Sequence, residues 1–140
     1  IGAFISSNEK MAVLKNNPIL GHITTFGGHP VSAAAAKACI EELLTTNYIE
    51  EVEEKAELIR SILLAHPKVK GIRNKGLMMS VQFDSFEQNK AIIDKAIELG
   101  VLSDWFLYCD DSLRIAPPLI ITKEEIKAAC DIIIEAIDSY

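Results

Sequence analysis

Residues 77–84 alternate apolar and polar side chains, and this alternation constrains the fold more than any other feature of the sequence. The apolar side chains that share one face are Leu77, Met79, Val81 and Phe83. A period of two is that of a half-buried strand. Apolar residues spaced three and four positions apart stand before and after this strand, as in helices that bury one face. The sequence therefore predicts an α+β domain, in which helices cover one face of a small, largely antiparallel sheet.

Two helices are expected ahead of that strand. The first begins at Pro30, because proline at the first helical position removes an N–H that has no helical partner, and it ends near Thr45. The second carries apolar residues at spacings of three and four from Ile49 to Leu63, and Pro67 ends it.

Two further helices are expected after the strand, each with a capping box at its start. Ser85 with Gln88 begins the first, and Thr122 with Glu125 begins the second. Gly100 closes the first of these helices. The last helix is expected to bury one face, made of Ile126, Ala129, Cys130, Ile133 and Ile137.

The remaining segments predict short elements. Val101-Leu102 and Leu113-Arg114-Ile115 predict two strands joined by a loop over residues 103–112. Residues 1–7 are apolar and predict the end of a strand whose partner is not evident. Residues 8–20 predict a short helical stretch that breaks at Asn16-Asn17-Pro18.

Composition narrows the class of protein. A chain of 140 residues with 49% hydrophobic content can bury one globular core. Its net charge of −6 argues against nucleic acid or an anionic membrane as the main partner. Three widely spaced cysteines, Cys39, Cys109 and Cys130, do not suggest a disulfide framework, so a reducing cytoplasm is expected. Cys39 and Cys130 fall in helical patterns and are expected to be small core residues.

Neither a membrane span nor a metal site is expected. No stretch is long and apolar enough to cross a membrane. His22, His29 and His66 have no metal-ligand spacing with one another or with the cysteines.

The loop from Thr24 to Pro30 has the composition of an anion-binding turn. Thr24 and Thr25 offer hydroxyl donors, while Gly27 and Gly28 permit a ligand to approach the backbone closely. The helix that follows adds the positive end of its dipole. The alternative is a capped loop that starts a helix and binds nothing.

Arg114 is the second candidate, because it stands in the apolar strand just before Pro117-Pro118. A guanidinium there can hold a carboxylate through two parallel hydrogen bonds. The alternative is a charge on an edge strand that discourages sheet pairing.

Other polar and aromatic clusters favour structural roles. Asp110-Asp111 are expected to be solvated turn formers rather than catalytic acids or metal ligands. Trp105, Phe106 and Tyr108 are expected to pack rather than to line a ligand pocket. A solvated basic rim is expected from Lys68, Lys70, Arg73 and Lys75.

Four segments, in order along the chain, resemble the class III (ornithine/acetylornithine-type) aminotransferases. Ile1-Gly2-Ala3-Phe4 resembles the family's Ile-Gly-Ala segment. The run from His22 to Pro30 resembles its His-x-Ser/Thr-Thr-Tyr/Phe-Gly-Gly-Asn-Pro signature. Asn74-Lys75-Gly76-Leu77-Met78 resembles the family's Gly-x-Gly-Leu entry to the sheet. The run from Leu113 to Thr122 resembles Leu-Arg-x-x-Pro-Pro-Leu-x-Ile-Thr.

The resemblance implies the C-terminal part of a fold-type I enzyme that depends on pyridoxal 5′-phosphate. It implies that Thr25, with Thr24 beside it, contacts the cofactor phosphate of the neighbouring subunit in a homodimer. It implies that Arg114 binds the carboxylate of an amino acid or 2-oxo acid substrate. Residues 1–29 would then be an arm of a larger domain, and residues 30–140 a small domain with its connecting helix.

The resemblance also implies that the Schiff-base lysine precedes the Ile-Gly-Ala segment, so no catalytic residue is expected within these 140 residues. This chain alone is therefore expected to be inactive. His29 and Asn74 depart from the family's Asn and Gly. A related aminomutase or decarboxylase, and a non-catalytic α+β dimerisation or binding module, are the alternatives. Self-association is expected from apolar residues near the start of the chain.

Overall fold

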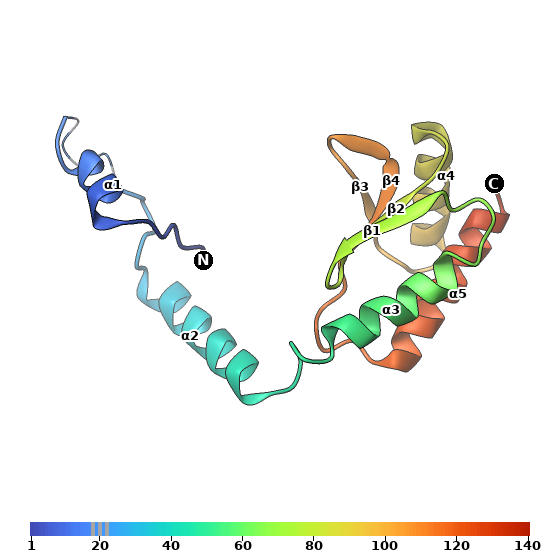
Figure 1. The fold of residues 1–140 in the computed structure, drawn as a ribbon, viewed down its shortest axis with the longest axis horizontal. Coiled ribbons are helices and arrows are strands. Elements are labelled where there is room, and N and C mark those ends of the chain that lie inside the picture. The colour runs from blue at the N-terminus through green and yellow to red at the C-terminus, as the bar shows by residue number, and fades with distance from the viewer. Residues whose placement is uncertain (18, 20, 22) are drawn as a thin grey trace. The chain divides into compact units, whose positions relative to one another are not determined.

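The computed structural model describes residues 1–17, 19, 21 and 23–140, which form two compact units (Figure 1). One unit is Ile1–Thr46 and the other is Asn47–Tyr140. Pro18, Leu20 and His22 lie outside the described residues. Part of the break predicted near residue 17 and the first residue of the His22–Pro30 motif therefore also lie outside them. The predicted division into residues 1–29 and 30–140 concerns a longer enzyme and stays a prediction.

The second unit contains a four-stranded antiparallel sheet. Its strands are β1 (Gly71–Lys75), β2 (Met78–Gln82), β3 (Asp104–Phe106) and β4 (Cys109–Ile115), in the spatial order β1-β2-β4-β3. The alternation at 77–84 is confirmed, because Leu77, Met79, Val81 and Phe83 are all buried. Together with its helices, this sheet confirms the predicted α+β class.

The structure corrects three strand predictions. β1 was not expected, and Val101-Leu102 forms no strand. β3 and the first part of β4 occupy the segment predicted as a loop, because residues 104–106 pair with β4 across a register shift at Trp105/Phe106. A short irregular hairpin of this kind leaves little alternation in the sequence.

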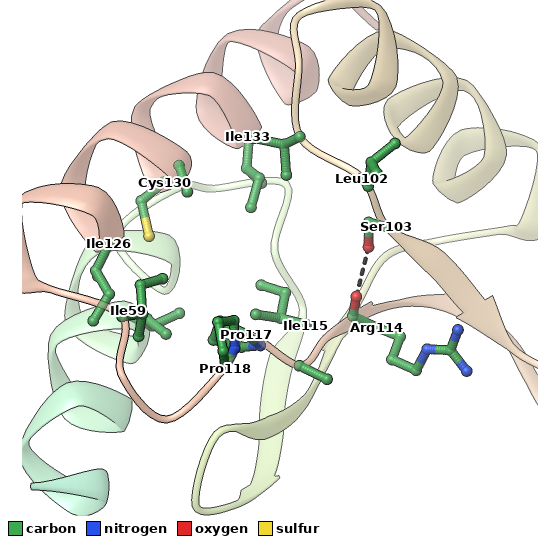
Figure 2. A pocket seen from close by; sticks show the side chains of 14 residues that line it. Ile59, Leu102, Ser103, Arg114, Ile115, Pro117, Pro118, Ile126, Cys130 and Ile133 are labelled. Atoms are coloured by element: carbon green, nitrogen blue, oxygen red, sulfur yellow. Dashed lines mark hydrogen bonds between the residues drawn. The ribbon is translucent and has the colours of Figure 1, made fainter. Parts of the chain in front are cut away.

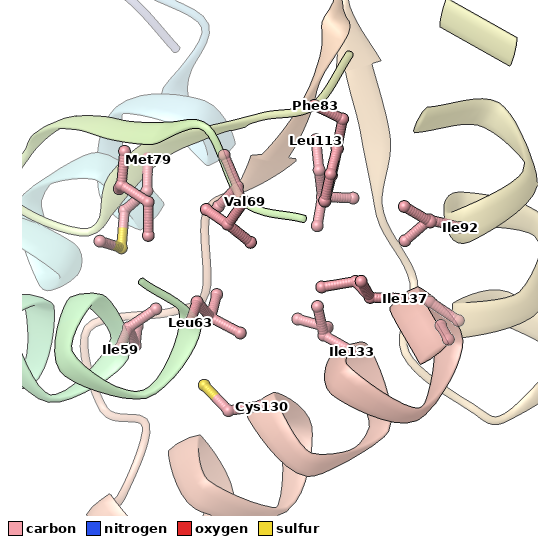
Figure 3. Close-up of a cluster of buried hydrophobic side chains, with 14 of the residues drawn as sticks. Ile59, Leu63, Val69, Met79, Phe83, Ile92, Leu113, Cys130, Ile133 and Ile137 are labelled. Carbon is pink, nitrogen blue, oxygen red and sulfur yellow. The ribbon is translucent and has the colours of Figure 1, made fainter. Parts of the chain in front are cut away.

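Three helices cover one face of the sheet (Figure 1). They are α3 (Val52–Leu63), α4 (Phe86–Glu98) and α5 (Lys123–Asp138). Figure 3 shows side chains from the sheet meeting those of the helices in one core. The fully buried core includes Leu63, Met79, Phe83, Ile92, Leu113, Ile126 and Ile137. The predicted inner face of α5 is confirmed, with Ala136 added to it and Ala129 only half-buried.

Local capping sets where the helices begin. The capping box of α5 is complete: the Thr122 hydroxyl accepts a hydrogen bond from the Glu125 amide, and the Glu125 carboxylate accepts one from the Thr122 amide. At α4 the box is half formed. Ser85 accepts from the Gln88 amide at 3.2 Å, but the Gln88 side chain accepts from the amide of Asp84 rather than Ser85.

The first unit contains α1 (Asn8–Ala12), a 3₁₀ turn at Val13–Lys15 and α2 (Pro30–Thr45). The helix predicted from Pro30 is confirmed with its end at Thr45. Residues 1–7 form no strand, because a strand needs a hydrogen-bonding neighbour and the described residues of this unit include none. None of the unit's described residues is buried, so the prediction of Cys39 as a core residue is wrong.

Candidate functional site

Arg114 lies on an interior strand of the sheet. β4 runs between β2 and β3, and Arg114 is paired in register with Ser80 on one side and Asp104 on the other. The alternative of an edge-strand charge is therefore wrong. Successive side chains of a strand point to opposite faces, so buried Leu113 faces the helices while exposed Arg114 faces away from them.

The Arg114 guanidinium has one ion-pair partner among the described residues. Its Nη2 lies 3.3 Å from Oδ2 of Asp104, and the two side chains are 43% and 49% exposed. The other Asp104 oxygen, Oδ1, accepts a hydrogen bond from the Trp105 amide at 2.8 Å. The pair borders an open hollow of about 330 Å³, which Leu102, Ser103 and Ala116 complete. A charged donor with this exposure can bind an incoming carboxylate.

The backbone around Arg114 is held from both sides. The Ser103 hydroxyl donates to the Arg114 carbonyl at 2.5 Å, as Figure 2 shows. Beyond the strand, the ammonium of Lys55, 5% exposed as a residue, donates to the Leu119 carbonyl at 2.8 Å and pairs with Glu51 at 2.9 Å. The bond from Lys55 attaches the segment that follows Arg114 to α3.

An apolar cavity of about 300 Å³ lies on the helix side of this segment (Figure 2). Ile59, Ile126, Cys130 and Ile133 line it, and the Arg114 guanidinium points away from it. Burial, and after it the charge of Asp131, raises the pKa of the Cys130 thiol to about 11. Arg114 therefore borders both this cavity and the open hollow, with its guanidinium directed away from the cavity.

Asp111 belongs to a hydrogen-bonded cluster rather than to the solvated turn that was predicted. Its carboxylate accepts from Gln82 at 2.8 Å, from Ser112 at 3.0 Å and from the Cys109 thiol at 3.2 Å. The bond from Gln82, followed by that from Cys109, lowers the pKa of Asp111. Among the described residues no group of acidic, histidine and cysteine side chains is arranged to hold a metal ion.

The aromatic residues before β4 behave differently from one another. Trp105 packs edge-on against Phe86 of α4, with ring centroids 5.6 Å apart, as expected of a packing residue. Tyr108 is fully exposed. Of the predicted basic rim, Lys70 pairs with Asp84 at 3.0 Å, while Lys68 donates to the last turn of α5 at 3.1 Å.

The Thr24–Pro30 loop forms a tight turn in the first unit. The Gly27 amide donates to the Thr24 carbonyl at 3.2 Å, and the His29 amide donates to the Phe26 carbonyl at 3.1 Å. A Cβ at Gly27 would overlap the Thr24 hydroxyl, so glycine is what lets this hydroxyl lie over the turn. Thr24 and Thr25 are exposed, and α2 begins directly after the loop without an acidic residue in its first turn. Hydroxyls beside a helix N-terminus fit a phosphate.

The structure brings Thr24 and Thr25 together in one unit and places Arg114 in the other. The sequence reasoning missed Asp104, the partner of Arg114, because it assigned residue 104 to a loop. A strand at 104–106 would have suggested this pair, since cross-strand neighbours on one face interact.

A family profile and a curated relative both match this chain, and both are of aminotransferases. The profile of the Aminotransferase class-III family matches residues 1–137. An acetylornithine aminotransferase of Caldanaerobacter subterraneus subsp. tengcongensis is 36% identical over 137 residues, which is 95% of this chain and 33% of that protein. The chain therefore spans about a third of the length of this relative.

Solved structures show the same likeness. The ornithine aminotransferase of Toxoplasma gondii is 30% identical with a TM-score of 0.76, over 92% of this chain and 31% of that one. The omega transaminase of Pseudomonas jessenii, solved in complex with PMP, is 25% identical with a TM-score of 0.80, over 94% of this chain and 32% of that one. With a family profile that matches nearly its whole length, this chain belongs to the class III aminotransferases.

Proposed function

We propose that this chain is part of a pyridoxal 5′-phosphate-dependent aminotransferase that moves an amino group between an amino acid and a 2-oxo acid such as 2-oxoglutarate. The observation that carries the proposal is Arg114, a half-exposed guanidinium on an interior strand beside an open hollow. Both substrates of such a reaction carry a carboxylate, and a guanidinium binds that group with a defined orientation. When bound, the cofactor supplies the electron sink for the reaction.

Within this chain, Arg114 orients the substrate by its carboxylate. We assign cofactor binding to Thr24 and Thr25, whose exposed hydroxyls stand beside the start of α2. In the proposed homodimer, this loop serves the phosphate of the cofactor in the neighbouring subunit. No residue of this chain is assigned a proton-transfer step, and no metal is needed for these roles.

The assembly is proposed to be a cytoplasmic homodimer. None of the helices in the described part of the chain has the length and apolar character needed to cross a bilayer. The first unit exposes apolar side chains, including Phe4 at 80% and Phe26 at 75%, which favours association. Sedimentation of the full-length protein tests this, and a monomer at micromolar concentration would contradict it.

Arg114→Ala in the full-length protein tests the function. A panel of amino acids is assayed with 2-oxoglutarate, and KM is measured for each active pair. Loss of a charged hydrogen-bonding partner is expected to raise KM by about ten- to a hundredfold. Arg73→Ala is the matched control, because Arg73 is also exposed and lies in the same row of the sheet, paired with Ser80. A wild-type protein that transfers no amino group, or an Arg114 variant with unchanged KM, would refute the proposal.

A further inference from the structure

Arg114 lies where the pairing between β3 and β4 stops. On the β2 side the pairing continues past Arg114, because Ile115 is paired with Met79. On the β3 side, the pair of Arg114 with Asp104 is the last one that the described residues form. Pro117-Pro118 have no N–H to donate, so backbone pairing does not extend far beyond this point. Backbone bonds therefore secure the end of β4 on the β2 side but not on the β3 side.

Ser103 closes the β3 side with its side chain. It directly precedes β3, and its hydroxyl donates to the Arg114 carbonyl at 2.5 Å (Figure 2). This distance is at the short end of the range for O–H···O bonds, about 2.5–3.0 Å. The bond joins two residues that are eleven positions apart in the chain. It holds the same peptide unit from which the Arg114 side chain extends.

The Ser103 hydroxyl has no second proton with which to bind a substrate. A serine carries one O–H donor, and here that donor is directed to the Arg114 carbonyl. Ser103 is half-buried and lines the open hollow together with Arg114. Its effect on a carboxylate in the hollow is therefore exerted through Arg114.

We propose that Ser103 is a positioning residue, whose hydroxyl fixes the Arg114 backbone so that the guanidinium presents two parallel donors to a carboxylate in the hollow. This rests on the proposed function, because it takes Arg114 as the carboxylate anchor. Two parallel hydrogen bonds require a defined orientation of the guanidinium. The guanidinium stands at the end of a long side chain, so a small rotation of the Arg114 peptide displaces it. Without the Ser103 bond, it adopts more orientations and binds a carboxylate less tightly.

Ser103→Ala in the full-length holoenzyme tests this role, because the substitution removes only the hydroxyl. Succinate, a dicarboxylate with neither an amino nor an oxo group, is the probe, and isothermal titration measures its dissociation constant. The variant is expected to raise this constant on the order of three- to tenfold, which is the effect of one hydrogen bond. In steady-state assays, KM for the 2-oxo acid is expected to rise by a similar factor, while kcat changes by less than about twofold.

Two control variants and a second ligand separate positioning from a general loss of structure. Ser103→Thr keeps the hydroxyl, and the hollow has room for the added methyl group, so succinate binding is expected to stay within about twofold of wild type. Ser61→Ala removes a hydroxyl that also donates to a backbone carbonyl, that of Leu58 at 2.8 Å, and is expected to leave succinate binding unchanged. Ser103→Ala is expected to leave the dissociation constant for pyridoxal 5′-phosphate unchanged, because that ligand does not depend on Arg114.

The outcomes distinguish this inference from the proposed function. If Arg114→Ala weakens succinate binding and Ser103→Ala does not, the positioning role is refuted and the carboxylate anchor stands. The role is also refuted if Ser103→Ala weakens succinate and cofactor binding equally, or if Ser103→Thr loses as much succinate affinity as Ser103→Ala. If Arg114→Ala leaves succinate binding unchanged, the proposed function itself fails.

Discussion

α2 and α5 are both 16 residues long, yet they relate to their surroundings in opposite ways. α5 begins with a complete capping box and buries five residues against the sheet and the other helices. α2 has no side-chain cap and no buried residue. Its large apolar side chains are exposed, with Ile40 at 55% and Leu44 at 77%.

The difference extends to the two units that contain these helices. Residues 47–140 enclose a core and hold Arg114 on a braced interior strand. The described residues of 1–46 enclose none and present the Thr24–Thr25 hydroxyls on a short turn. Most helical stability in proteins comes from packing of an apolar face. The second unit therefore carries the stability of this chain, while the first is proposed to supply groups that act on a neighbouring subunit.

Truncation of one isoleucine in each helix gives the largest expected contrast. Ile133 of α5 is 3% exposed, and Ile133→Ala is expected to lower the free energy of unfolding by about 2–5 kcal/mol. Ile40→Ala in α2 is expected to change it by less than about 0.5 kcal/mol, because the side chain is already exposed. Urea unfolding of this chain, followed by circular dichroism, measures both. Equal losses of unfolding free energy in the two variants would show that Ile40 is packed as tightly as Ile133, which would contradict this contrast.

The reactivities of two native cysteines, one in each helix, allow the same comparison without a mutation. Cys39 of α2 is exposed, whereas Cys130 of α5 is 2% exposed and its thiol pKa is raised to about 11. Because the thiolate is the reactive species, Cys130 is expected to react with iodoacetamide about a hundredfold more slowly at pH 8 than Cys39. Peptide mass spectrometry of samples quenched at successive times measures the alkylation rate of each cysteine. Comparable rates would contradict the burial of Cys130.

Two lysine–glutamate pairs, each four residues apart on a helix, give a smaller contrast. Lys55 is buried and also donates to the Leu119 carbonyl, so Lys55→Ala is expected to cost about 1–3 kcal/mol of unfolding free energy. Lys37 pairs with Glu41 in solvent, at 76% and 62% exposure. Lys37→Ala is expected to cost less than about 0.5 kcal/mol. The same urea titration measures both, and a costly Lys37→Ala would place α2 in contact with another part of the chain.

Much of the second unit was predictable from local patterns. The alternation of β2 and the capping box of α5 are set by neighbouring residues, and both are confirmed. β1 and β3 were missed because they are the edge strands of the sheet. An edge strand tolerates polar side chains, such as Arg73 and Asn74 in β1, and so loses the apolar alternation.

The features that the sequence did not predict depend on contacts between residues that are distant in the chain. Arg114 stood out because a charge interrupts an apolar run. Its partner Asp104 is ten residues away and meets it only through the register of β3 on β4. Cys39 was misjudged for a related reason: helical spacing shows that a residue can share an apolar face, but burial requires another element against that face.

The two regions are proposed to hold two different groups, and cofactor titration of the full-length apoenzyme tests this most directly. Thr25→Ala is expected to raise the dissociation constant for pyridoxal 5′-phosphate by about tenfold, because it removes the proposed hydrogen bond to a charged phosphate. Arg114→Lys is expected to leave that constant unchanged, since the role proposed for Arg114 is in substrate binding. An unchanged cofactor affinity in Thr25→Ala, or an equal loss in both variants, would contradict the account.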